Sequence, residues 1–213
     1  MLIFYGHPFS SYSWKAQIAL YEKGIDFEYR NVDPEFPEHG PELRGHWPIG
    51  KFPLIVHDGQ PWFEASIIID YLAQHHAGRT ALIPADPDEA RSVRLKDRFY
   101  DLYVHDPMQR IVGNKLRPAD AKDPHGVAEC DARLETAYDM IEDEMATRTW
   151  SNGDSFTMAD CAAAPALHYA NRIHPIGEAR PNALAYLERL KQRPSFARVL
   201  QEAEPFAGMF PGR

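Results

Sequence analysis

The 213-residue sequence predicts an α/β domain over residues 1–78, followed by an all-helical domain over residues 88–213. Three observations support this prediction. Short apolar runs alternate with one helical pattern at the start of the chain, an Asp-Gly pair separates two further apolar runs, and the later apolar patterns have helical spacing. One or two domains are expected for a chain of this length.

The start of the chain predicts a strand, a helix and a second strand. Residues 2–5 are a compact apolar run, which is typical of a buried strand. Apolar residues at helical spacing follow from about Ser13, and Gly24 is placed to end that helix. Residues 27–32 alternate aromatic and polar side chains, as strands do. Because a crossover of this kind is right-handed and joins parallel strands, we expect the two strands to be parallel.

The next segments predict an irregular stretch and a β-hairpin. Residues 33–50 are rich in Pro, Gly, Glu and His, and we expect them to be irregular. Two apolar runs, residues 51–57 and 61–64, lie on either side of Asp58-Gly59. An Asp-Gly pair between apolar runs is a strong signal for a hairpin turn.

The remaining patterns are helical. Residues 67–72 predict a short, mostly buried helix ending near Gly78, and a linker with two prolines follows over residues 78–88. A polar loop is expected over residues 113–126. The helices expected in the second domain span residues 93–112, 128–145, 157–173, 181–191 and 194–203.

Composition excludes several classes of function. The chain contains 23 Lys and Arg against 31 Asp and Glu, a formal net charge of −8. Nucleic-acid binding needs a basic surface, so this balance argues against nucleic acid as the main partner. No run of about 18 apolar residues occurs, which argues against a membrane partner. Cys130 and Cys161 lie far from any CxxC or zinc-ligand spacing, so we expect no metal site and a reducing, cytoplasmic setting.

The first domain resembles the thioredoxin-like domains. Residues 50–55, Gly-Lys-Phe-Pro-Leu-Ile, resemble the loop in which that fold holds a cis-proline before its third strand. Pro53 would be this proline, and the cis form of an X–Pro bond costs only about 0.5–1 kcal/mol. Thioredoxins carry CxxC after the first strand, whereas residues 9–12 here are Phe-Ser-Ser-Tyr. Without a thiol at that position, disulfide exchange is excluded.

With the helical second domain attached, the whole chain resembles the cytosolic glutathione S-transferases, and especially the zeta-type and related bacterial members that use a serine. Three stretches carry the resemblance: residues 10–20, which begin Ser-Ser-Tyr-Ser-Trp-Lys; residues 50–53 with 64–72, similar to the family's glutathione-holding turn and helix; and residues 153–160. In the third stretch, Thr157 and Asp160 form a capping box, to which we assign a role in folding.

The resemblance implies that a serine hydroxyl at the start of the first helix stabilises the thiolate of glutathione, which is the nucleophile. Ser10 is the best match to the active serine, and Ser11, one residue off in register, is an alternative. Tyr5 is a third candidate, since other transferases use a tyrosine at the end of the first strand. A helix N-terminus favours an anion in any case, so the two serines could also serve only as helix caps.

The resemblance also implies a glutathione-binding set in which Glu64 contacts the ammonium group of the γ-glutamyl end. The sequence departs from the family pattern at the next position, where Ala65 stands in place of the usual Ser or Thr. A missing hydrogen bond to a charged group weakens binding by about 1.5–3 kcal/mol, unless Ser66 compensates. The full set comprises Lys51, Phe52, Pro53, Glu64, Ala65 and Ser66.

The leading function is therefore glutathione transfer to a small hydrophobic electrophile, with detoxification as the expected role and glutathione as co-substrate. A zeta-like glutathione-dependent isomerase and a non-catalytic binding protein are the alternatives, and Ala65 favours the second of these. The family implies a homodimer. The electrophile pocket would be lined by Tyr12, Tyr103, His105 and Tyr169, with Tyr100 and Met108 as further candidates.

Charge is unevenly distributed along the chain. Residues 1–77 contain five Lys and Arg and ten Asp and Glu, a net charge of −5. An anionic peptide therefore meets no broad positive field on this domain, and its capture has to rely on local donors.

Overall fold

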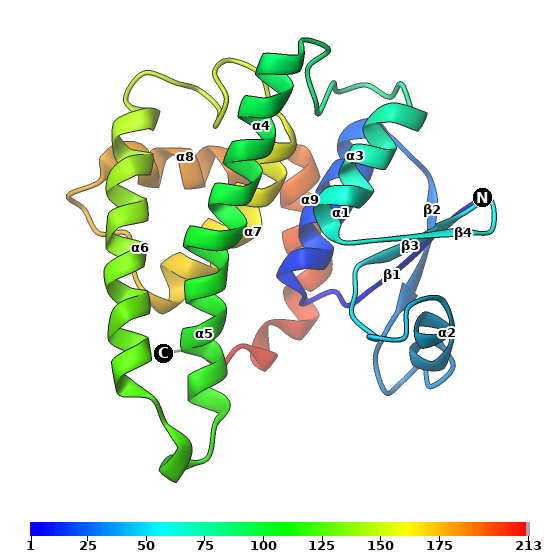
Figure 1. The fold of residues 1–213 in the computed structure, drawn as a ribbon, viewed down its shortest axis with the longest axis horizontal. Helices are drawn as coiled ribbons and strands as arrows, with labels where there is room; N and C mark the ends of the chain where they lie inside the picture. Colours follow the sequence, from blue (N-terminus) through cyan, green and yellow to red (C-terminus); the bar gives the residue numbers. More distant parts are fainter. Residues whose placement is uncertain (212–213) are drawn as a thin grey trace.

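The structure, a computed structural model, describes residues 1–211; the last two residues of the predicted helical domain, 212 and 213, lie outside the described part. The α/β domain and the helical domain lie side by side (Figure 1). In the first domain, the elements are β1 (Leu2–Gly6), α1 (Ser11–Lys23), β2 (Phe27–Asn31), α2 (His39–His46), β3 (Leu54–His57), β4 (Gln60–Phe63) and α3 (Ala65–His75).

A four-stranded sheet in the order β2-β1-β3-β4 forms the centre of the first domain. β1 and β2 are parallel, with Leu2 opposite Phe27, and this confirms the predicted strand–helix–strand unit. β3 pairs antiparallel with both β1 and β4, so the hairpin at Asp58-Gly59 is confirmed as well. The peptide bond before Pro53 is cis, immediately ahead of β3.

Helices cover both faces of this sheet. On one face, Phe4 and Ile55 pack against α1 and α3, and on the other, Leu54 packs against Leu43 of α2. The prediction that residues 33–50 are irregular was wrong at this point, because α2 lies within them. Its pattern is weak: Leu43 is the one fully buried residue of α2, and Gly and Pro interrupt the helix.

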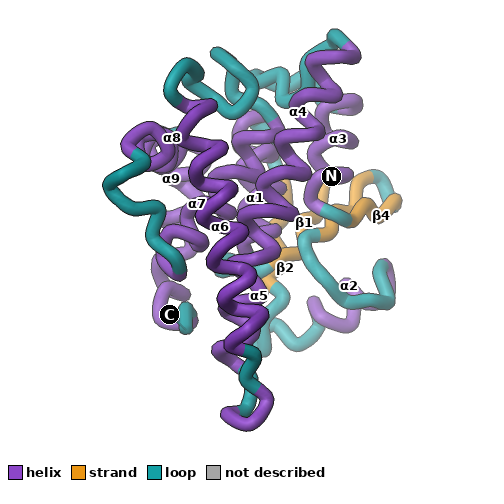
Figure 2. The backbone as a smooth tube through the Cα atoms, turned by 60° about the vertical axis from the view of Figure 1, so that its left-hand side comes forward, coloured by secondary structure: helices purple, strands orange, loops and turns teal. Residues whose placement is uncertain are grey.

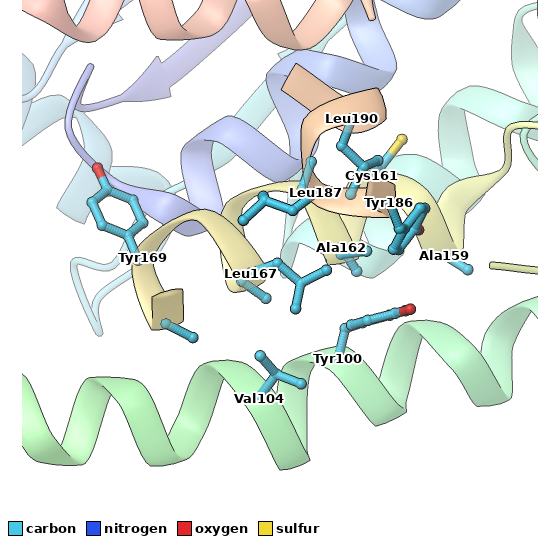
Figure 3. Close-up of a cluster of buried hydrophobic side chains, with 14 of the residues drawn as sticks. Tyr100, Val104, Ala159, Cys161, Ala162, Leu167, Tyr169, Tyr186, Leu187 and Leu190 are labelled. Carbon is cyan, nitrogen blue, oxygen red and sulfur yellow. The ribbon is translucent and has the colours of Figure 1, made fainter. Parts of the chain in front are cut away.

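The second domain consists of helices around a buried α7, whose side chains form much of the core (Figure 3). Its elements are α4 (Pro87–Phe99), η1 (Tyr100–His105), α5 (Asp106–Leu116), η2 (Ala119–Ala121), α6 (Pro124–Met145), α7 (Met158–Ile173), α8 (Pro181–Gln192), α9 (Pro194–Ala203) and η3 (Glu204–Met209). Trp14 and Ile18 of α1 belong to the same core, so the two domains share apolar contacts.

Helix boundaries differ from the sequence prediction at α4, α5 and α6, the last of which begins at Pro124, four residues earlier than expected. α4 begins at Pro87, six residues earlier than expected, because the Asp86 carboxylate accepts hydrogen bonds from the N–H groups of Asp88 and Glu89. α5 continues to Leu116, into the stretch expected to be a loop. α4, η1 and α5 run as one continuous column of helix (Figures 1 and 2).

The middle of that column, η1, is a π-helix rather than an α-helix. Such segments are rare and occur frequently at functional sites. η1 packs against α7 and carries buried Asp101 and His105. Within residues 1–211, no helix has the length and apolar character required to span a membrane.

Candidate active site

Two adjoining cavities lie where the start of α3 faces α4 and η1. Their volumes are about 220 and about 430 Å³. Both are lined by Tyr12, Glu64, Ala65, Arg98 and Asp101. The smaller cavity is also lined by Trp47, Lys51, Phe52, Pro53, Phe63 and Leu102, and the larger by Ser66, Ile67, Asp70, Arg94, Asp97 and Met158.

The smaller cavity brings together most of the residues expected to bind glutathione: Lys51, Phe52, Pro53, Glu64 and Ala65. Lys51 and Glu64 are exposed, so their charges are open to a ligand, whereas Ala65 is buried. Glu64 has a φ of 67°. This conformation is uncommon for residues other than glycine, and such conformations cluster at active sites and ligand clamps.

Ser10 is the N-cap of α1. Its Oγ accepts a hydrogen bond from the N–H of Ser13 at 3.2 Å. Accepting this bond leaves the hydroxyl hydrogen of Ser10 available to a further acceptor. Ser10 lines neither of the two cavities, whereas Tyr12, one half-turn further along α1, lines both.

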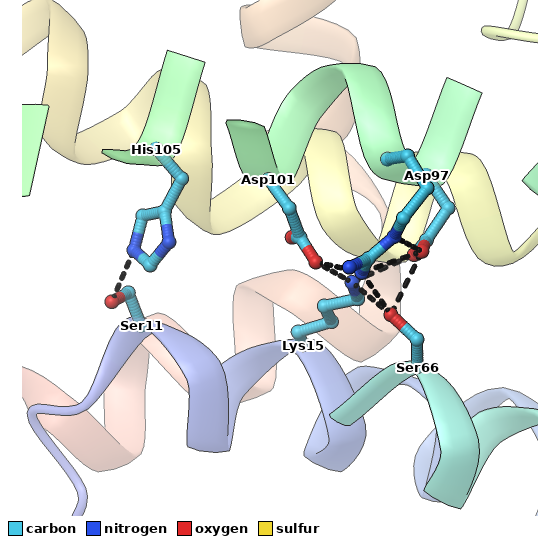
Figure 4. Close-up of polar contacts among 7 residues, drawn as sticks. Ser11, Lys15, Ser66, Asp97, Asp101 and His105 are labelled. Atoms are coloured by element: carbon cyan, nitrogen blue, oxygen red, sulfur yellow. Dashed lines mark hydrogen bonds and ion pairs between the residues drawn. The ribbon is translucent and has the colours of Figure 1, made fainter. Parts of the chain in front are cut away.

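Ser11 is buried and contacts the helical domain (Figure 4). The Nε2 atom of His105 lies 2.6 Å from its Oγ, and the side-chain amide of Gln109 donates to the same oxygen at 3.3 Å. The ring of Tyr12 packs edge-on against His105, with 4.1 Å between centroids. Ser11 therefore joins α1 to η1 and α5.

Burial, with a smaller effect of Lys15, lowers the pKa of His105 to about 3. A histidine in an unfolded chain titrates near 6.5. Between these two values the unfolded chain binds a proton at this position and the folded protein does not. The folded protein therefore loses stability as the pH falls below about 6.5.

We accordingly expect the free energy of unfolding to decrease by up to about 1.4 kcal/mol per pH unit through this group below pH 6.5. Urea unfolding at pH 7 and at pH 5 measures the decrease. Between pH 7 and pH 5 this group accounts for about 2 kcal/mol of the decrease, so the decrease in His105→Gln should be smaller by about 2 kcal/mol, since the substituted side chain does not titrate. Equal decreases in the two proteins would contradict the assignment.

The hydroxyl of Tyr5, the third candidate for contacting the sulfur, is hydrogen-bonded to other residues. It donates to Oε2 of Glu42 at 3.1 Å and accepts from Nη1 of Arg30 at 2.9 Å. The Tyr5 side chain packs beside Leu54 on the α2 side of the sheet. Burial and the bond to Glu42 raise the pKa of Tyr5. These contacts favour a structural role for Tyr5.

A buried group of charges lies next to Ser11 and His105, between α1, α3 and the column of α4 and η1 (Figure 4). Nζ of Lys15 is 2.7 Å from Oδ1 of Asp97 and 2.8 Å from Oδ2 of Asp101. Lys15 and Asp97 are each 1% exposed, so their charged groups contact each other and almost no water. Arg98 also contacts Asp97 and Asp101 from the cavity side.

Ser66 belongs to this charged group. Its Oγ donates to Asp97 at 2.8 Å and accepts from Lys15 at 2.8 Å and from Arg98 at 2.5 Å. A hydroxyl has one hydrogen and two lone pairs, so all of its hydrogen-bonding capacity is used. The structure therefore does not support Ser66 as a substitute for the hydroxyl missing at Ala65.

The residues expected to line one electrophile pocket are dispersed. Tyr12 lines both cavities, whereas Tyr103 is exposed and His105 is covered by Ser11 and Tyr12. The hydroxyl of Tyr169 donates to the carbonyl oxygen of Phe9 at 3.0 Å, and its ring stacks on Trp14. Tyr100 and Met108 lie in the core. Of this set, Tyr12 alone lines the two cavities, because helical spacing by itself does not determine which face of η1 meets α1.

Sequence reasoning also missed Lys15, Asp97, Arg98 and Gln109. One signal was present: Lys15 is a charged residue between the apolar Trp14 and Ala16 of α1. A second signal is the spacing of four between Asp97, Asp101 and His105, which places them on one face of a helix.

The comparisons with known proteins agree with this geometry. The family model described as glutathione S-transferase, N-terminal domain, matches residues 4–80, and the corresponding C-terminal domain model matches residues 124–189. Glutathione S-transferase 3 of Zea mays is 31% identical over 205 residues, which cover 92% of this chain and 91% of that protein. A probable maleylacetoacetate isomerase of Caenorhabditis elegans is 28% identical over 211 residues, 97% of this chain and 96% of that protein.

A solved structure of a glutathione S-transferase from Methylobacterium radiotolerans, in complex with glutathione sulfonate, superposes with a TM-score of 0.77 at 26% identity and covers 93% of each chain. Both domain models match in the order in which the two domains occur here, and the relatives align over nearly their whole length. The chain therefore belongs to the cytosolic glutathione S-transferases, a family of transferase enzymes built from a thioredoxin-like and a helical domain.

Proposed function

We propose that this protein transfers glutathione to a small hydrophobic electrophile, with Ser10 stabilising the glutathione thiolate. The observation that carries the proposal is the smaller cavity, in which the cis Phe52–Pro53 turn, Lys51 and Glu64 meet beside the start of α1. A turn of this kind offers backbone groups to the cysteinyl part of the peptide, and Glu64 offers a carboxylate to its ammonium group.

In the proposed reaction, the Ser10 hydroxyl donates a hydrogen bond to the glutathione sulfur. This bond favours the thiolate over the thiol, and the thiolate attacks the electrophile. The thiol proton passes to solvent and a carbon–sulfur bond forms from the sulfur electron pair. In a displacement the leaving group departs with its bonding electron pair; in an addition the π electrons of the electrophile move to the neighbouring atom, which takes up a proton from water. Because Ser10 also accepts from the N–H of Ser13, its Oγ atom is already held in place before glutathione binds.

Titration calorimetry with glutathione, followed by a conjugation assay with an aryl halide, tests this function. We expect saturable binding below millimolar concentration and conjugation that depends on both substrates. Absence of binding at millimolar glutathione would refute the proposal. Binding without turnover across a panel of electrophiles would favour a non-catalytic binding protein instead, which is the alternative suggested by Ala65.

A glutathione-dependent isomerase is a second candidate. It is favoured by the resemblance to the probable maleylacetoacetate isomerase and by the Ser-Ser opening of α1. An isomerase regenerates glutathione in each turnover, whereas a transferase consumes it. Incubation with maleylacetoacetate and a substoichiometric amount of glutathione distinguishes the two, because only an isomerase converts the whole substrate.

We also propose a homodimer acting in detoxification in the cytoplasm. Apolar side chains that one chain leaves exposed support the dimer: Ile67 of α3, Leu95 of α4, and Leu102 and Tyr103 of η1 are each about half exposed or more. The two cysteines are free and buried, which agrees with a reducing setting. Light scattering should give twice the mass of one chain.

A further inference from the structure

We propose that Arg98 binds the α-carboxylate of the γ-glutamyl end of glutathione, in place of the hydroxyl that is missing at Ala65. This inference rests on the proposed function, because it takes glutathione as the ligand. It assigns to a residue of α4, in the helical domain, a contact that the sequence pattern would place on α3.

Four contacts to three residues hold the Arg98 guanidinium at the wall of the cavities. Nη2 donates to Ser66 at 2.5 Å and to Asp97 at 3.0 Å, and it also contacts Asp101. Nε donates to Asp97 at 3.2 Å. One edge of the planar group is therefore fixed by the protein, and its orientation is set before a ligand enters.

The remaining edge of Arg98 is available. Within residues 1–211, Nη1 has no hydrogen-bond partner, although it carries two N–H donors. The side chain is 50% exposed. Among the Lys and Arg side chains of the described residues, Arg98 alone lines both the smaller and the larger cavity. A carboxylate in either cavity therefore meets the same guanidinium.

Glu64 lines both cavities as well, and its carboxylate makes no capping hydrogen bond to α3 and has no ion-pair partner within residues 1–211. A carboxylate and a guanidinium that line the same cavities are suited to a group that carries both charges. In glutathione only the γ-glutamyl end does so, because its ammonium and α-carboxylate are attached to the same carbon. Glu64 on the ammonium therefore directs the carboxylate towards Arg98.

The charges next to the cavity are compatible with this contact. Lys15 and Arg98 balance Asp97 and Asp101, so the group is neutral before the ligand binds. Ser66 cannot contribute, since its hydroxyl is fully used by its three partners. Nη1 of Arg98 can thus give a charge-assisted hydrogen bond to a carboxylate beside Ala65.

Arg98→Ala should raise the Kd and KM for glutathione by about tenfold to a hundredfold, the effect of losing one charge-assisted hydrogen bond, and leave kcat within about twofold. Arg91→Ala is the matched control, because Arg91 is also on α4 but is 75% exposed, pairs with Asp88 and lines neither cavity. It should leave the Kd unchanged.

A comparison of two ligands distinguishes the loss of a direct contact with Arg98 from a general disturbance of the cavity. The probe is 4-aminobutanoyl-cysteinyl-glycine, which is glutathione without the α-carboxylate. Wild type and Arg98→Ala should bind the probe equally weakly. The double variant Arg98→Ala with Ala65→Ser should recover affinity for glutathione but not for the probe. If Arg98→Ala weakens binding of glutathione and of the probe by the same factor, the assignment is overturned. If wild type binds no glutathione at all, that result refutes the proposed function rather than the assignment of the carboxylate contact to Arg98.

Discussion

Ser10→Ala should lower kcat/KM for glutathione conjugation about a hundredfold at pH 7, the order of effect seen when one preorganised donor to a developing anion is removed. The Kd for glutathione should change by less than about threefold, because the hydroxyl is proposed to contact the sulfur and not the peptide ends. The pKa of the bound thiol should rise, so activity should recover partly as the pH is raised. Steady-state kinetics and the ultraviolet absorbance of the bound thiolate measure the two effects.

The fold should survive this substitution. Losing the cap to Ser13 costs about 1 kcal/mol, which is small against the 5–15 kcal/mol by which domains are typically stable. Ser11→Ala is the control. The Ser11 hydroxyl is buried against His105 and Gln109, so its removal should lower the activity by less than tenfold. A larger loss in Ser11→Ala than in Ser10→Ala would move the active serine one residue along α1.

Asp160→Ala should destabilise the protein by about 4 kcal/mol, the largest effect on stability that we expect from a single substitution. The carboxylate is fully buried and accepts four hydrogen bonds. Two come from the N–H and hydroxyl of Thr157, which completes the capping box of α7. The others come from the N–H of Ser151 at 2.8 Å and from the hydroxyl of Tyr186 at 2.6 Å.

Removing the Asp160 carboxylate leaves these donors without a partner in a site that water does not reach, and each buried unsatisfied group is costly. Denaturant unfolding measures the loss. Asp160→Asn keeps one acceptor oxygen and should lose about half as much. A loss below about 1 kcal/mol in Asp160→Ala would mean that the surrounding residues rearrange to satisfy the donors.

The order of elements in the first domain was predictable because each of its signals is local. The apolar run of β1, the Asp-Gly turn and Pro53 each report on a backbone conformation within a few residues. The capping box at Thr157 and Asp160 is local for the same reason, since its two residues are three apart. α2 escaped prediction because it buries little besides Leu43 and so lacks an apolar period.

The grouping of the residues that we propose to bind glutathione was predictable on the same basis. Lys51, Phe52 and Pro53 are consecutive, and Glu64 and Ala65 begin the next helix, so their joint position follows from one hairpin. The structure adds that all five line one cavity. It also shows that the Ser66 hydroxyl is bonded to Lys15 of α1 and to Asp97 of the helical domain.

The fold class, the turn that holds the cis-proline and the segment that carries Ser10 follow from the amino-acid sequence, because they depend on short-range backbone preferences and on a recognisable order of motifs. How the two domains meet follows only from their packing in three dimensions. Lys15 and Asp101 are 86 residues apart and Ser11 and His105 are 94 apart. Contacts at such separations depend on the packing angle of α1 against η1 and on which side chains it removes from water, and no periodicity within either helix encodes that angle.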